Sequence, residues 1–300
     1  MTGHPVTGDT AYDAINEETD TGHRWAYGTG FTGPLDGVDT TLPAGIDGQD
    51  LAAYCLMLGD DALIMSHRLQ QWLARAPELE EETALANIAL DLLGQARLLL
   101  SRAGAADGSG RTEDDLAFGR VEREFRNVRL AEVGDADFAG LIARLLAFST
   151  WRLALLDRLR DSADPVLAAV AAQGVKELAY HRDYSAQWLV RLGDGTDYSR
   201  SLVVAGLAAV APLVPELFEA TPVERRLAEV RAAVDPAGLR AEFDAVLGAV
   251  LEAAGLEWPQ VPAMAAVSGQ AGRDGVHTES MGYLLAELQS VARSLPGATW

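Results

Sequence analysis

The chain has 300 residues, 49% of them hydrophobic, so it can bury a large core in one or two domains. Its formal net charge is −20, and a surface this acidic repels nucleic acid and anionic lipid. A single cysteine, Cys55, excludes an internal disulfide and any cysteine-based zinc or iron–sulfur site. The sequence contains neither an apolar leader nor an uncharged stretch of about 18 residues, so we expect a cytoplasmic protein without a membrane-spanning helix.

Residues 1–44 are rich in Gly, Thr and Asp, which predicts a flexible N-terminal tail. Helical structure is expected to begin near Asp47 or Asp50, since either residue can cap a helix. A first helix is predicted from about residue 50 to residue 75, where Pro77 ends it. A second helix is predicted to continue to about residue 102, with Gly104 as its stop. The C-terminal half of this second helix is apolar on almost every side, which is typical of a buried helix.

A long connection, residues 105–135, separates these helices from a third helix at about 137–160 and a fourth at about 166–192. The connections after the first and third helices are short, whereas the one after the second is long enough to cross the bundle. The second and third helices can therefore be parallel, which predicts an all-α, ferritin-like four-helix bundle with one long crossover. Additional C-terminal helices are predicted at about 199–219, 223–234, 236–254 and 278–295, with a Gly/Pro-rich loop at 255–277. We expect them to pack on the same bundle, so that 45–300 form a single domain. A helical repeat array is the alternative, but no fixed repeat period occurs.

The predicted bundle carries part of a metal site on its first helix. A di-iron site in such a bundle uses one Glu from each of two helices and a Glu-x-x-His pair from each of the other two. On a helical wheel, Asp60 and His67 share the inward face of the first helix. Asp61 and Arg68 are predicted to face away from the core. The first helix therefore offers one acid and one histidine in an unusual spacing.

The other helices complete the site only in part. Asp91 lies on the inward edge of the second helix, and Glu177 and His181 lie on the fourth. Gly94 and Tyr180 stand where the histidines of the two Glu-x-x-His pairs would be required. The middle of the third helix contains no acid. The sequence therefore predicts a ligand set that is incomplete on the second, third and fourth helices.

We interpret the five candidates as a buried polar network, the relic of a metal site, in which two histidines neutralise three acids. The five residues are Asp60, His67, Asp91, Glu177 and His181. Two alternatives remain open: a non-standard or single metal bound by Asp60, His67, Glu177 and His181, and a working di-iron centre. We expect Glu177→Leu to destabilise the fold more than Asp61→Leu, because only the first change leaves buried partners unpaired.

No nucleophile constellation, phosphate-binding loop or dinucleotide-binding fingerprint occurs in the chain. Of the remaining histidines, His277 is expected to lie at the start of the last helix, with Thr278 as the cap. A functional role for His277 at an interface is the alternative.

Several long segments, in order along the chain, resemble a known family. They are LGDDALIMSHRLQQWLARAPELE (58–80), ALANIALDLLGQARLLL (84–100), DDLAFGR (114–120), KELAYHRDYSAQWLVRLGDGTD (176–197) and GVHTESMGYLLAELQSVARSLPG (275–297). Together they resemble the family of the C subunit of the bacterial phenylacetyl-CoA 1,2-epoxidase, the multicomponent oxygenase of aerobic phenylacetate breakdown. The resemblance covers about 45–300 and leaves the tail out.

The resemblance implies a ferritin-like subunit that is homologous to the catalytic A subunit and lacks its di-iron centre. In such complexes, the A and C subunits form a core that the small B subunit joins, and a reductase with flavin and iron–sulfur groups supplies electrons from NADPH. The complex inserts one oxygen atom of O₂ into the ring of phenylacetyl-CoA. No catalytic, cofactor-binding or metal-binding residue is then expected in this chain. An independent metal-binding oxidoreductase and a free-standing helical binding module are the alternatives.

Overall fold

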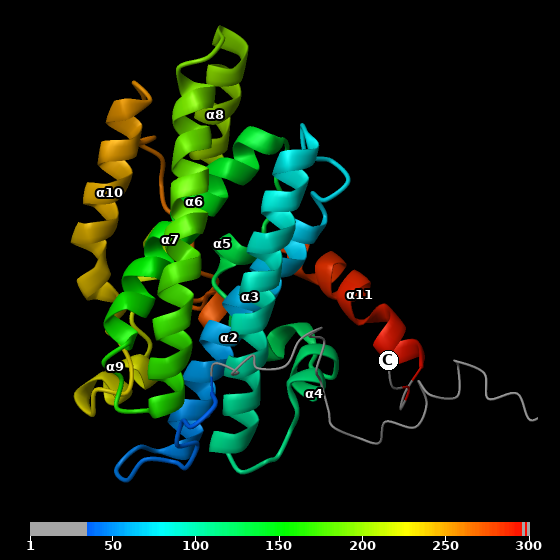
Figure 1. The fold of residues 1–300 in the computed structure, drawn as a ribbon, viewed down its shortest axis with the longest axis vertical. Helices are drawn as coiled ribbons and strands as arrows, with labels where there is room; N and C mark the ends of the chain where they lie inside the picture. The colour runs from blue at the N-terminus through cyan, green and yellow to red at the C-terminus, as the bar shows by residue number, and fades with distance from the viewer. Residues whose placement is uncertain (1–34, 296–297, 299–300) are drawn as a thin grey trace, which may run out of the picture. The chain divides into compact units, whose positions relative to one another are not determined.

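The computed structural model describes residues 35–295 and residue 298, and these residues form helices and loops without a β-strand. Contacts between Cα positions divide the chain into 1–36 and 37–300, and every helix of the described residues lies in the second unit. Four of the helices are long: α2 (Gly48–Gln70), α3 (Leu79–Ala106), α6 (Phe138–Leu159) and α7 (Pro165–Gly193), which appear in blue, cyan and green in Figure 1. The all-α prediction is confirmed. The flexible tail predicted for 1–44 lies, as far as residue 34, outside the described residues.

Aspartate side chains cap three of these helices at their N-terminal ends. Asp47 accepts hydrogen bonds from the first turn of α2, as the sequence predicted, and Asp137 and Asp164 do the same for α6 and α7. The first helix is shorter than predicted, because residues 71–76 form turns before Pro77. The second is longer, and Gly104 lies inside it. A Cβ atom at Gly104 would collide with the backbone of Arg111, so glycine is required there by close packing.

Contacts along the helices establish their directions. Ser66 of α2 donates a hydrogen bond to the carbonyl of Ala89 in α3, and Gly59 lies against Leu100. Residue numbers therefore fall along α2 as they rise along α3, which makes the two helices antiparallel.

Helix α6 is antiparallel to α2 as well. Arg152 of α6 donates to the carbonyl of Leu58, and Arg144, two turns earlier, donates to the sulfur of Met65. Since α3 and α6 are both antiparallel to α2, they are parallel to each other. The crossover between them therefore has the predicted ferritin-like topology.

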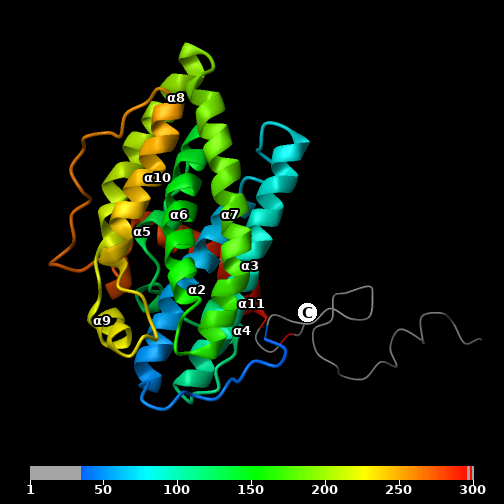
Figure 2. The ribbon, with the colours of Figure 1, turned by 60° about the vertical axis from the view of Figure 1, so that its left-hand side comes forward.

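The crossover and the C-terminal third are built from short helices that cover the bundle (Figure 2). The crossover contains α4 (Glu113–Phe118), η1 (Glu122–Glu124) and α5 (Arg129–Glu132). The C-terminal third contains α8 (Asp197–Val210), η2 (Ala211–Leu213), η3 (Pro215–Phe218), α9 (Pro222–Glu229), η4 (Pro236–Leu239), α10 (Arg240–Ala253), η5 (Gly272–Asp274) and α11 (Glu279–Ser294). The helix predicted over 199–219 ends early because Pro212 and Pro215 interrupt it.

By length and composition alone, α3 and α6 are apolar enough to cross a membrane, and the bent pair 197–213 and 215–229 would make a third candidate. In α6, 94% of the apolar window is buried inside the protein, compared with 44% in α3. Helix α6 is therefore the central helix of the fold. Helix α3 is more exposed than its sequence predicted, and Leu90 on its outer face has an exposed fraction of 61%.

Candidate functional site

Asp60 lies in α2 and is fully buried, as predicted, but it points toward the crossover. Both of its carboxylate oxygens accept hydrogen bonds from the guanidinium of Arg120, one of them at 2.9 Å. The backbone N–H of Arg126 donates a further hydrogen bond at 2.8 Å. These charge-assisted bonds are among the strongest in proteins, and they fasten the crossover to the bundle.

Asp61, the next residue, was predicted to face solvent, and this prediction is wrong. Its carboxylate is fully buried and pairs with both terminal nitrogens of Arg273, at 3.0 and 2.9 Å. The backbone N–H of Val128 donates to it at 2.8 Å. Burial raises the pKa of Asp61, against the opposing charges of Arg273 and Arg152. The crossover and the segment before α11 cover the face of α2 that a helical wheel assigns to solvent.

A polar chain runs from the surface of α7 to the centre of the bundle. The partly exposed Glu177 accepts hydrogen bonds from Gln173 at 2.7 Å and from Gln95 at 2.8 Å. Gln95 in turn accepts a hydrogen bond from Arg152 at 3.0 Å. Burial lowers the pKa of the fully enclosed Arg152 to about 10, which still leaves its guanidinium protonated at neutral pH. A permanent cation from α6 therefore lies between α2 and α3, where an iron bundle holds its metal ligands.

The two remaining candidates on α3 and α7 pair with each other. Nε2 of His181 lies 2.9 Å from a carboxylate oxygen of Asp91, and the histidine is fully buried while Asp91 is partly exposed. Of the five candidates, these are the two side chains that contact each other directly.

His67 forms no hydrogen bond or ion pair with the other candidates, and its Nε2 is buried without a hydrogen-bond partner among the described residues. Burial lowers the pKa of His67, which favours the neutral ring. The prediction that two histidines neutralise all three acids is therefore wrong for Asp60 and Glu177, which contact arginine and glutamine.

The five candidates do not surround a common point. Within 35–295, the only group of three acids, histidines or cysteines with ligand atoms all within 4.8 Å is Glu78, Glu80 and Glu81, at the exposed start of α3. Two carboxylates bridging a metal pair must be free to turn both oxygens toward it. Asp60 and Asp61 instead direct theirs at guanidinium groups. The residues present therefore do not fit a carboxylate-bridged iron pair.

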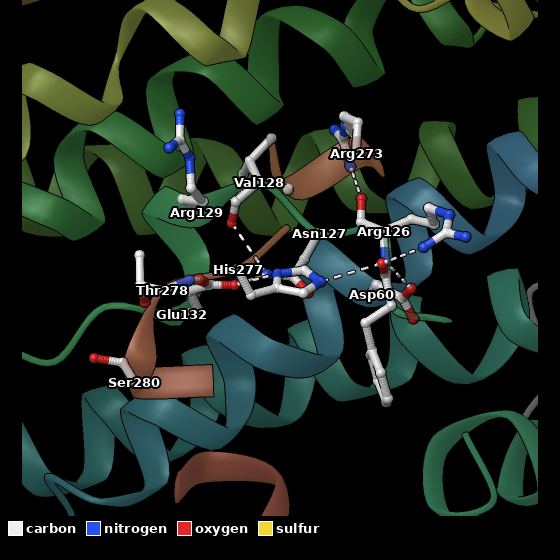
Figure 3. A network of polar contacts seen from close by, with 12 residues as sticks. Asp60, Arg126, Asn127, Val128, Arg129, Glu132, Arg273, His277, Thr278 and Ser280 are labelled. Carbon is white, nitrogen blue, oxygen red and sulfur yellow. Dashed lines mark hydrogen bonds and ion pairs between the residues drawn. The ribbon is translucent and has the colours of Figure 1, made fainter. Parts of the chain in front are cut away.

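A second buried cluster surrounds His277, which the sequence placed only at a helix start. Nδ1 of its ring lies 2.7 Å from a carboxylate oxygen of Glu132, and Nε2 lies 3.2 Å from the carbonyl oxygen of Phe125 (Figure 3). Both neighbours can accept hydrogen bonds, so the geometry favours protons on both ring nitrogens, which is the imidazolium form. Burial opposes this charge, but the hydrogen bond and charge of Glu132 outweigh burial and raise the pKa of His277.

Glu132 is itself fully buried and joins three segments. Besides the ring of His277, it accepts hydrogen bonds from the side chain of Asn127 and from the backbone N–H of Thr278 (Figure 3). Thr278 occupies the cap position of α11 as predicted, but its side chain makes no capping hydrogen bond. Glu132 accepts a hydrogen bond from the N–H of Thr278 itself, so an acid of the crossover is bonded to the residue that precedes the last helix.

One signal in the sequence could have indicated the residues that were missed. Arg144 and Arg152 lie in an otherwise apolar stretch of α6, and both are fully buried. A buried guanidinium requires acceptors, and Arg144 finds them in Asp135. Two arginines on an apolar helix thus indicate a charged interior, although the sequence does not identify the partners.

Comparison with known proteins places the chain in a group of relatives. A family model described as "Phenylacetic acid catabolic protein" matches 40–300. The chain is 45% identical over 252 residues to a protein of Escherichia coli (strain K12) named as the C subunit of 1,2-phenylacetyl-CoA epoxidase. The matched region is 84% of this chain and 100% of the relative.

Proposed function

We propose that this chain, which belongs to the family of phenylacetic acid catabolic proteins, is a non-catalytic structural subunit of a phenylacetyl-CoA 1,2-epoxidase. The Escherichia coli relative is named as the C subunit of the epoxidase, and we propose the same role for this chain. The relative is matched over its full length, so each of its segments has a counterpart in this chain.

The absence of a metal centre of its own is supported by one observation above all, the cation at the centre of the bundle. Arg152 lies between α2 and α3, 3.0 Å from Gln95 and 3.2 Å from the carbonyl oxygen of Leu58. A metal dication beside this guanidinium would be repelled, because like charges interact strongly in an interior of low dielectric constant. The two buried acids of α2 are already paired with arginine.

In this proposal the chain supports the catalytic di-iron subunit, the A subunit of the complex, and contacts the small B subunit. The chemistry is supplied by groups outside this chain: iron in the catalytic subunit, and flavin and iron–sulfur groups in a reductase that takes electrons from NADPH. We propose a cytoplasmic location without a nucleic-acid or membrane partner, in agreement with the net charge of −20.

Two measurements test the proposal. Metal analysis of the purified chain should find far less than one iron per chain, and about two irons per chain would contradict it. Size-exclusion chromatography of the chain mixed with the catalytic subunit should show a stable complex. A chain that remains separate from the catalytic subunit over a range of concentrations would argue for a free-standing module.

The alternative is an independent metal-binding oxidoreductase that uses the off-pattern ligands. It requires His181 to leave Asp91, which lies 2.9 Å away, and to bind a metal. This alternative predicts that the wild-type chain binds a divalent metal and that His181→Ala abolishes the binding. Our proposal predicts that calorimetric titration with a divalent metal gives the same result for the wild type and for His181→Ala.

A further inference from the structure

Most of the loop between α10 and η5 is exposed and carries no charged side chain. No charged side chain occurs between Glu257 and Arg273, whereas 23% of the residues in the whole chain are charged. We call residues 258–270 the neutral loop. Every residue of the neutral loop from 260 onward is exposed, and its largest exposed apolar side chains have exposed fractions of 40% for Val261, 38% for Met264 and 61% for Val267. Figure 2 shows the segment in orange, running outside the helices.

The neutral loop is held in a defined conformation from its base. The backbone N–H of Met264 donates to the carbonyl of Pro212 at 2.7 Å. Arg129 donates to the carbonyl of Ala265 at 3.0 Å and, through its Nε, to Glu216 at 2.7 Å. The side chains of Arg129 and Glu216 are buried, so this ion pair connects the loop to the interior.

The tip of the loop is equally defined. Val267 and Gln270 exchange two backbone hydrogen bonds, of 2.9 and 3.0 Å, across a two-residue turn. Ser268 and Gly269 both have positive φ, 53° and 78°, as a tight hairpin turn of this kind requires. Exposed apolar side chains are thus presented in an ordered arrangement, so a partner would bind the loop with a small loss of conformational entropy.

A pocket adjoins the loop at Met264. Its volume is about 290 Å³, and apart from Met264 it is lined mainly by α8, the start of α6 and the residues before it. The lining from α8 consists of small and aliphatic residues, Ala205, Gly206, Ala209 and Val210. The pocket lining also contains Arg144 and Asp135, which are paired with each other, and Asp137, whose side chain caps α6. The loop and the pocket together form a mainly apolar surface with a depression that an apolar side chain can fill.

We propose that the neutral loop and this pocket form the surface on which the catalytic subunit docks, an inference that rests on the function proposed above. The central part of a permanent interface is depleted of charge, as the neutral loop is, and is enriched in methionine, which the loop exposes at Met264. A second copy of this chain is the less suitable occupant, because two chains that each carry a net charge of −20 repel each other. The same charge opposes an anionic membrane.

The test uses the full chain and the catalytic subunit, with substitutions matched in exposure. Val267→Asp places a charge at a loop position with an exposed fraction of 61%, and Leu90→Asp places one at the same exposed fraction on α3. Neither residue is buried, so both variants should fold. We expect Val267→Asp to weaken binding to the catalytic subunit by at least about tenfold, as a charge at the centre of an interface does, and Leu90→Asp to bind as the wild type does. Amide hydrogen exchange in 258–270 should slow in the complex.

The outcomes separate the two proposals. If the wild type binds the catalytic subunit while Val267→Asp binds equally well and the loop exchanges at an unchanged rate, the docking surface is refuted and the subunit role stands. If the wild type fails to bind the catalytic subunit, both proposals are refuted. Co-sedimentation of the wild type with phosphatidylcholine vesicles, lost in Val267→Asp, would identify the loop as a membrane contact and also overturn the docking surface.

Discussion

Replacement of Asp61 by leucine should destabilise the protein far more than the same replacement of Glu177. This order is the reverse of the one expected from the sequence, because Asp61 is fully buried and Glu177 is partly exposed. In the variant, the guanidinium of Arg273, 8% exposed, would lose both of its carboxylate contacts, and the N–H of Val128 would lose its acceptor. Breaking a buried ion pair by removing one partner costs about 3–5 kcal/mol. Glu177 is partly exposed and forms hydrogen bonds with the uncharged side-chain amides of Gln95 and Gln173, so its loss should cost about 1 kcal/mol.

Thermal and urea unfolding of the two variants measure this difference. For a domain of this size about 1 kcal/mol corresponds to a melting temperature shift of about 2–4 °C, so Asp61→Leu should melt about 6–20 °C below the wild type. Arg273→Met together with Asp61→Leu should recover part of the loss, because the double variant no longer leaves the cation of Arg273 buried without its carboxylate. Equal melting temperatures for Asp61→Leu and Glu177→Leu, or a greater loss in Glu177→Leu, would refute the assigned ion pair.

Two further results are expected. Because its pKa is raised in the folded state, His277 stabilises the fold fully at pH values below its ordinary pKa of 6.5. This stabilisation is lost as the pH rises through the folded-state pKa. The free energy of unfolding, measured from about pH 6 to about pH 9, should therefore fall in the wild type by an amount that is absent in His277→Gln. Hydrogen exchange should locate the loosening in α11, and an identical pH dependence in both proteins would contradict the assigned imidazolium. Gly206→Ala should cost about 1–3 kcal/mol in urea unfolding, since its Cβ would lie 2.9 Å from the Cα of Gly140, while the control Gly248→Ala, which meets nothing within 4 Å, should be neutral or slightly stabilising. Equal stability of these two glycine variants would show that α6 and α8 are less closely packed at Gly206 than the structure indicates.

The helices and their order could be predicted because both depend on local features of the sequence. Apolar periodicity, the caps at Asp47, Asp137 and Asp164, and the lengths of the connections all act over short distances along the chain. The predicted ends of the helices were wrong by a few residues. The second helix continues past Gly104, where glycine is required because a Cβ atom would collide with the backbone of Arg111. Such a contact is invisible to local rules.

The candidate site was predicted less well because a helical wheel assumes one buried face and one solvated face. Helix α2 is covered on more than one side. Arg68, which the wheel placed in solvent, donates to the carbonyl of Glu132 at 2.7 Å and to that of Ser280 at 3.0 Å. The prediction for Asp61 was wrong for the same reason, since its partner, Arg273, is 212 residues away in the sequence. Asp60 is buried as expected, but the arginine that pairs with it, Arg120, comes from the crossover, a segment whose position the sequence does not specify.

The pairing of Asp61 with Arg273 also constrains how the chain can be synthesised and folded. The two residues are separated by 212 positions, and the same separation joins Arg68 to Ser280. Contacts of such high sequence separation close late, because the intervening chain must first be ordered. At a synthesis rate of about 5–20 residues per second, the pair of helices α2 and α3 would be complete many seconds before Arg273 is synthesised. During this time the carboxylate of Asp61 would lack its ion-pair partner. A chain truncated before residue 273 should then be captured by chaperones, since its bundle cannot close around Asp61.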